Sequence, residues 1–137
     1  IAAIRLLILT GARTSEILGL QWDWVDFESN VAALPDSKTG RRTLYLSSEA
    51  TAVLTQIPRV EGNPFVIAGS KAGRALVKLK RPWKLRTAAE LQDVRFHDLR
   101  HSYASVAAAA ETPLPQVGAL LGHYPPRNDR PRRALGR

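Results

Sequence analysis

The pattern of hydrophobic and polar positions begins with residues 1–9, which are apolar on nearly every side. A helix without a polar face is normally buried, and Gly11 is a common type of residue just past a helix end. A shorter apolar pattern over residues 15–20 predicts a second helix, with Thr14 or Ser15 as its N-cap. The chain is therefore expected to open with two packed helices.

The pattern then changes to short apolar runs at residues 24–27, 31–34 and 43–46. Turn-forming residues separate these runs, which is typical of strands joined by hairpins. The pattern predicts a small antiparallel sheet with Lys38 at the tip of its second hairpin. A lysine there can swing toward a ligand held elsewhere, although a lone loop lysine is more typically just solvated.

Helical patterns return after the sheet. Further helices are predicted over residues 48–57, 97–111 and 114–121, and a brief strand is predicted over 64–68. Ser48 is the expected N-cap of the first of these helices. This order of elements predicts a mostly helical α+β fold with one small sheet.

The helix beginning at His97 lies in the segment FHDLRHSYAS, residues 96–105. At roughly 100° of rotation per residue, one face carries His97, Arg100, His101 and Ala104, and the opposite face carries Leu99, Tyr103 and Val106. The first turn of a helix presents unpaired N–H groups and the positive end of the dipole, so an arginine and an imidazole there suit an anionic oxygen such as that of a phosphate. Taken alone, the pattern is more typical of a solvated amphipathic helix.

Arg13 lies in the connection between the two predicted N-terminal helices. An unpaired buried charge is costly, so this arginine needs a carboxylate, a backbone carbonyl or a ligand phosphate as partner. Glu16, one turn further on, is the nearest candidate. A purely structural pair and a ligand-binding arginine are both compatible with the sequence.

The formal net charge is +8, from 20 basic and 12 acidic residues, and it suggests a polyanionic partner. Residues 71–86, here called the basic stripe, contain no acidic residue. Their basic side chains belong to Lys71, Arg74, Lys78, Lys80, Arg81, Lys84 and Arg86. The interleaved apolar residues are Leu76, Leu79, Trp83 and Leu85. This pattern indicates an element, kinked or divided by Pro82, that packs on one side and faces either phosphates or solvent on the other.

Length and composition set further bounds. A chain of 137 residues with 45% hydrophobic content is expected to form one small domain with a real core. The absence of cysteine excludes disulfides, thiolate chemistry and cysteine-ligated metals. No apolar run is long enough to span a bilayer and no signal segment leads the chain, so a soluble protein is predicted. The start within a helix and the lack of methionine suggest a fragment.

Four motifs in one chain order carry a resemblance. They are GARTSEILGLQW with Arg13, KTG with Lys38, FHDLRHSYAS with His97 and Arg100, and LLGH with His123. Together they resemble the catalytic domain of the tyrosine recombinases, the phage integrase family. The resemblance implies that residues 1–123 form part of this α+β domain, which normally follows a DNA-clamping domain. Residues 124–137, rich in Arg and Pro, are expected to be a disordered tail.

The resemblance implies site-specific DNA recombination through a phosphotyrosyl intermediate. Arg13 and Arg100 would hold the nonbridging phosphate oxygens, and His97 and His123 would add hydrogen bonds. Lys38 would protonate the leaving 5′-oxygen as general acid. No metal and no cofactor are expected. The implied partners are double-stranded DNA and other recombinase protomers, and no membrane is involved. The implied location is the cytoplasm, in association with the nucleoid, for a protein of bacterial or phage origin. The basic stripe is the expected DNA surface.

The nucleophile is the point at which the sequence departs from the family. The family's tyrosine usually follows the LGH histidine by about nine residues, and Arg132 occupies that position here. Tyr124 adjoins His123 and precedes two prolines, while Tyr103 and Tyr45 are expected on a buried helix face and in a strand. None is a credible nucleophile. The sequence suggests a truncated or frameshifted integrase that is inactive in this form.

Two alternatives come from other classes of function. The basic stripe alone would suit a noncatalytic DNA-binding module. His97 and His101, spaced i, i+4, would suit a metal site with His123 as a third ligand. The metal interpretation is weaker, because no glutamate accompanies the pair as in H-E-x-x-H and Arg100 between them would repel a cation.

Overall fold

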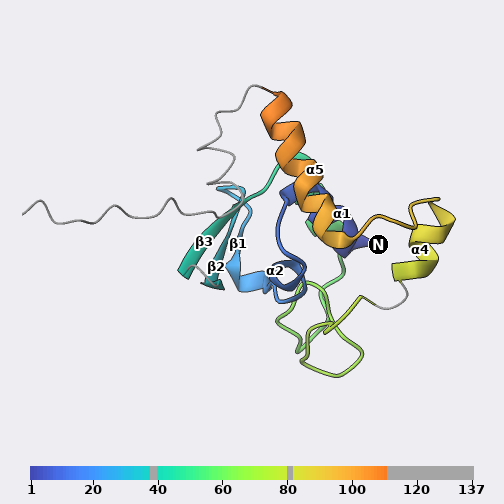
Figure 1. The fold of residues 1–137 in the computed structure, drawn as a ribbon. Helices are drawn as coiled ribbons and strands as arrows, with labels where there is room; N and C mark the ends of the chain where they lie inside the picture. Colours follow the sequence, from blue (N-terminus) through green and yellow to red (C-terminus); the bar gives the residue numbers. More distant parts are fainter. Residues whose placement is uncertain (38–39, 80–81, 111–137) are drawn as a thin grey trace, which may run out of the picture.

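The computed structural model describes residues 1–37, 40–79 and 82–110, and Figure 1 shows how their elements are arranged. In chain order these are α1 (Ala2–Thr10), α2 (Thr14–Leu18), the 3₁₀ turn η1 (Trp22–Trp24), β1 (Val25–Asp26), β2 (Val31–Ser37), β3 (Gly40–Tyr45), α3 (Ser48–Gln56), α4 (Pro82–Ala88) and α5 (Phe96–Ala109). The mostly helical α+β fold with a three-stranded sheet is confirmed. Within the described ranges, no helix is long and apolar enough to cross a membrane.

The first helix is buried as predicted, with Leu6 and Leu7 only 1% and 2% exposed. It ends at Gly11, which has a left-handed backbone with φ 64°. A Cβ at Gly11 would collide with the ring of Tyr103, so glycine also permits the close approach of α5. The predicted N-cap of α2 was wrong: Arg13 holds that position, because its backbone N–H is satisfied by the side chain of Glu16 three residues on.

The sheet is antiparallel in the order β1-β2-β3. The pairs Ala32 with Leu44 and Leu34 with Arg42 fix the register of β2 on β3, and all four side chains are buried. The first strand is shorter than predicted, because η1 takes up the residues before it. Lys38 at the hairpin lies outside the described residues.

The helix α3 packs against α1 and contributes Ala50, Val53 and Leu54 to the core. Its N-cap is Ser47, whose Oγ accepts from the Ala50 N–H at 3.2 Å, so the prediction of Ser48 was wrong by one residue. Serine is a favourable residue at either position, and the sequence alone did not separate the two neighbours.

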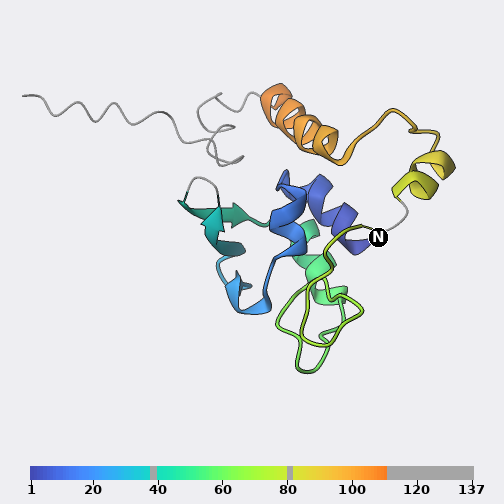
Figure 2. The same cartoon turned by 60° about the horizontal axis from the view of Figure 1, so that its bottom comes forward.

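The segment between α3 and α4 forms loops on the side of α1 away from α5 (Figures 1 and 2). The strand predicted over 64–68 is wrong, because the structure has only the isolated bridges Gln21 with Phe65 and Ala68 with Ala75 there. Val66 is nevertheless buried, 2% exposed, so the apolar run marks the core rather than a strand. Residues 71–79 contain neither a helix nor a named strand.

The last described helix, α5, packs on α1 and places Tyr103 against Gly11. Two predictions about its faces were wrong. Val106 is 69% exposed, because α5 has 14 residues and outlasts the nine-residue α1 on which it packs. Arg100 is only 5% exposed, whereas His97 and His101 are exposed. The predicted polar face is therefore split between a buried cation and two exposed imidazoles. The short helix predicted over 114–121 lies outside the described residues.

Candidate active site

The side chain of Glu16 is the centre of a group of arginines at the start of α2. Its Oε2 accepts from the Arg13 backbone N–H at 2.8 Å, and its Oε1 accepts from Arg13 Nη1 at 3.0 Å. This capping arrangement fixes both the entry of the chain into α2 and the direction of the guanidinium group. The predicted partner of Arg13 is confirmed.

Arg42 reaches the same carboxylate from the sheet. Its Nη1 donates to Glu16 Oε2 at 2.5 Å, and its side chain is 2% exposed. The sequence pattern did not single out Arg42, which lies one position before the predicted strand 43–46. The signal was the alternation along β3, because residues two apart share a face and Leu44 faces the core.

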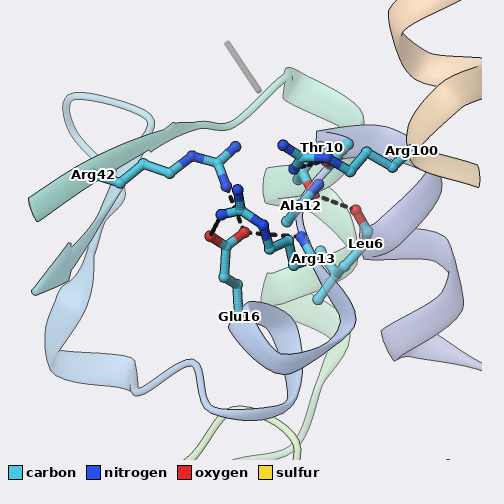
Figure 3. Close-up of polar contacts among 8 residues, drawn as sticks. Leu6, Thr10, Ala12, Arg13, Glu16, Arg42 and Arg100 are labelled. Carbon is cyan, nitrogen blue, oxygen red and sulfur yellow. Dashed lines mark hydrogen bonds and ion pairs between the residues drawn. The ribbon is translucent and has the colours of Figure 1, made fainter. Parts of the chain in front are cut away.

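Arg100 comes to the group from α5, 89 residues beyond its partner in the chain. Its Nη1 donates to the Gly11 carbonyl at 2.9 Å and ties α5 to the connection between α1 and α2. Thr10 stiffens that connection, because its Oγ1 donates to the Leu6 carbonyl at 2.6 Å and accepts from the Ala12 N–H at 3.2 Å. Figure 3 shows Arg13, Arg42 and Arg100 directed toward one region beside Glu16.

The electrostatics of this arginine cluster, defined as Arg13, Arg42 and Arg100 with Glu16, are unbalanced. Burial by itself would raise the pKa of Glu16, but hydrogen bonds from Arg13 and Arg42 and their charges outweigh it, and the pKa lies below its usual value. Burial lowers the pKa of Arg100, and the charges of Arg13 and Arg42 lower it further. Three guanidinium groups to one carboxylate leave an excess of positive charge in a largely buried place, which suits an oxyanion.

Of the remaining predicted catalytic residues, the structure describes only His97. His97 lies in the first turn of α5, exposed, and its ring meets that of His101 edge-on with centroids 4.8 Å apart. Lys38 and His123 lie outside the described residues, so their roles stay predictions. Within the described part of the chain, no three His, Cys, Asp or Glu side chains form a group able to hold a metal ion.

Neither tyrosine that the structure describes, Tyr45 or Tyr103, is positioned to act as the nucleophile. Tyr45 is 55% exposed on β3, where the burial alternates and Arg42 and Leu44 face the other side. Tyr103 is half-buried against Gly11. Tyr124 and the position of Arg132 lie outside the described residues.

The basic stripe differs from the prediction in shape. Lys71, Arg74 and Lys78 are exposed in the irregular segment before α4, and they line an open groove of about 810 Å³. Leu76 and Leu79 pack against the core as predicted, whereas the side chains of Trp83 and Leu85 lie outside the described part of the structure. Helix α4 begins at Pro82, which favours a first helical position, and carries the exposed Lys84. Lys80 and Arg81 lie outside the described residues.

The chain is similar to known proteins in sequence and in fold. The model of the phage integrase family matches residues 1–127. The chain is 32% identical over 130 residues to prophage integrase IntF of Escherichia coli (strain K12), covering 90% of this chain and 28% of that protein. It is 32% identical over 129 residues to tyrosine recombinase XerC of Pseudomonas syringae pv. tomato, covering 89% and 43%.

Two solved structures share the fold. One is the XerA recombinase, with a TM-score of 0.74 at 18% identity, covering 90% of this chain and 47% of that one. The other is the XerH site-specific recombinase bound to its difH substrate, with a TM-score of 0.73 at 22% identity, covering 90% and 39%. The chain thus spans less than half the length of each of these four relatives.

Proposed function

Because the chain belongs to the phage integrase family, we propose that residues 1–123 form the catalytic domain of a tyrosine-type site-specific recombinase that acts on double-stranded DNA. The observation that carries this proposal is the convergence of Arg13, at the start of α2, and Arg100, from α5. They meet beside the single carboxylate of Glu16, whose one negative charge cannot neutralise two guanidinium groups. A phosphodiester supplies the missing negative charge and accepts planar, bidentate donors.

Each site residue has a distinct role in this proposal. Arg13 and Arg100 hold the nonbridging oxygens and stabilise the charge that develops at phosphorus. His97 and His123 donate hydrogen bonds to the same group, and Lys38 protonates the leaving 5′-oxygen. Arginine cations provide the electrostatic stabilisation, and the orientation of Arg13 by Glu16 limits the reorganisation needed during the reaction.

The nucleophile is proposed to lie outside the residues of this sequence. Tyr45 is on the outward side of β3 and Tyr103 is packed against Gly11, while Tyr124 precedes two prolines. The family model matches residues 1–127, so the position of Arg132 lies outside the match. We infer that residues 124–137 are a frameshifted or otherwise aberrant segment, and that this form of the protein binds DNA without cleaving it.

The basic stripe supports DNA binding independently of the arginine cluster. The exposed Lys71, Arg74 and Lys78 surround an open groove, and such side chains suit contacts to a phosphate backbone. XerH is described as bound to difH substrate and lambda integrase as a tetramer on a Holliday junction. By analogy, double-stranded DNA and further protomers are the proposed partners here. A noncatalytic DNA-binding module is the second candidate, and it is favoured by these same exposed cations.

A suicide DNA substrate, which traps a covalent protein–DNA adduct, tests the proposal. The full chain should give no adduct. Replacing the residues after His123 by a family helix with tyrosine about nine positions on, and supplying a clamp domain, should restore at least slow cleavage. Arg100→Lys should then impair cleavage, because the bidentate donor is lost. Arg5→Lys is the matched control, since Arg5 is exposed on α1.

Two outcomes would contradict the proposal. An adduct formed by the unaltered chain and mapped to Tyr124 would refute the account of the nucleophile. Restored cleavage that is unaffected by Arg100→Lys would refute the assignment of the arginine cluster. Absence of cleavage after the tyrosine helix and the clamp domain have been supplied would instead favour the noncatalytic module for this chain.

A further inference from the structure

Arg42 occupies an inward position of β3, where an aliphatic residue would be expected. Its side chain is 2% exposed, and its register partner Leu34 and its neighbour Leu44 are 4% and 1% exposed. Replacing a buried ion pair by packed hydrophobic side chains is often neutral or stabilising. Packing alone therefore does not explain an arginine at this position.

The contacts of Glu16 show what Arg42 adds. Oε1 accepts from Arg13 Nη1 at 3.0 Å, whereas Oε2 accepts from Arg42 Nη1 at 2.5 Å and from the Arg13 backbone N–H at 2.8 Å. If Arg42 were replaced by a neutral residue, Glu16 and Arg13 would form a one-to-one pair without net charge. With Arg42 in place, the carboxylate still holds Arg13, and the three side chains keep one net positive charge.

We propose that Arg42 is a positioning residue for Arg13: its ion pair offsets the charge of Glu16, so that the carboxylate orients Arg13 without cancelling its attraction for a phosphate group. This inference rests on the proposed function, in which Arg13 contacts the phosphodiester. Arg42 acts through Glu16 and need not touch the anion. The three cations also influence one another: the pKa of Arg100 is lowered by burial and then by the charges of Arg13 and Arg42.

A titration of the full chain with inorganic sulfate, followed by NMR of the arginine Nε–Hε groups, measures this effect. Arg42→Met should weaken sulfate binding on the order of tenfold, because one unit charge a few ångströms away in a partly buried site has at least that influence. Adding Glu16→Gln to Arg42→Met should return the affinity to within about threefold of the original, because the amide no longer cancels Arg13. Arg42→Lys, which keeps the charge, should bind nearly as well as the original.

The double variant gives a result that a merely structural role cannot produce. If Arg42 served only packing, then removing the charge of Glu16 would not restore binding. If Arg42 contacted the anion itself, its own Nε–Hε signal would shift with sulfate as much as that of Arg13. A double variant that binds sulfate as weakly as Arg42→Met would therefore overturn the proposal. Circular dichroism checks that each variant folds, and Arg42→Gln replaces Arg42→Met in both backgrounds should the methionine variant unfold.

The carboxyl ¹³C signal of Glu16 separates failure of this inference from failure of the proposed function. Arg42→Met should raise the pKa of Glu16 whether or not any anion binds, because a charge and a hydrogen bond are both removed. A protein that shows this change but binds no sulfate would refute the phosphate site and retain the coupling of Arg42 to Glu16. An unchanged pKa of Glu16 would refute the coupling itself.

Discussion

The two groups of basic side chains in this protein are built in opposite ways. The arginine cluster draws its members from α2, β3 and α5, and Arg42 and Arg100 are each 5% exposed. The basic stripe is continuous in sequence, and Lys71, Arg74 and Lys78 are exposed on irregular backbone. The cluster fixes the positions of its guanidinium groups through hydrogen bonds to Glu16 and Gly11. These three side chains of the stripe offer positive charge that is open to solvent.

This difference matches two different physical tasks. Stabilising one phosphate during a reaction requires donors that are held in place and shielded from water, where their interactions are strong. Binding a long polyanion requires many exposed charges whose contacts are screened by salt and carry little sequence information. Net charge alone did not distinguish these tasks, because it counts buried and exposed cations equally.

The largest expected effect comes from removing the carboxylate of the cluster. Glu16→Ala takes away the acceptor of Arg13 and of the buried Arg42, and should lower the free energy of unfolding by about 3 kcal/mol, as when one partner of a buried ion pair is removed. Lys78→Ala, in the stripe, should change it by less than about 0.5 kcal/mol. Urea unfolding measures both. Equal effects of the two substitutions would remove the contrast between the regions.

A smaller effect, on binding rather than stability, is expected from the stripe. Replacing Lys71 and Lys78 by glutamate should weaken binding to duplex DNA by on the order of tenfold. The slope of the logarithm of the binding constant against the logarithm of the salt concentration should fall by the equivalent of about two phosphate contacts. Fluorescence anisotropy at several salt concentrations measures both quantities. The matched control reverses Arg5 on α1. If the affinity and its salt dependence stay unchanged in this variant, the basic stripe is excluded as the DNA surface.

The smallest effect is a dependence of stability on pH through Glu16. Its pKa in the folded protein is below the ordinary value of 4.5, so its ionised form stabilises the fold above that value, and this stabilisation is lost as the pH falls through the lowered pKa. The difference in unfolding free energy between the original protein and Glu16→Gln should therefore shrink in acid. Urea unfolding at a series of pH values tests this. A difference that grows in acid would contradict the sign.

The sequence was sufficient for the elements whose patterns are strong and local. The apolar run of α1, the hairpins and the helix of Arg100 were all predicted, as was the pair of Arg13 with Glu16. It was not sufficient where tertiary packing decides. The apolar residues of the stripe indicated a packed element, yet residues 71–79 reach the core from loops.

The same limit applies to the site. Arg100 was found through its motif, but its burial depends on how α5 lies across Gly11, which no local pattern encodes. The alternation along β3 could have marked Arg42 as inward-facing, but its pairing with Glu16 could not be predicted, because the partner is 26 residues away and on another element. Motifs thus located the residues of the proposed chemistry, and only the fold located a residue that supports them.

The most direct test of the central claim is a crystal structure of the full chain grown with sulfate or with a heavier tetrahedral oxyanion that can be located by anomalous scattering. We expect an anion within hydrogen-bonding distance of the guanidinium groups of both Arg13 and Arg100, beside Glu16. Anions found only along the basic stripe, or guanidinium groups of Arg13 and Arg100 too far apart to share one anion, would contradict it.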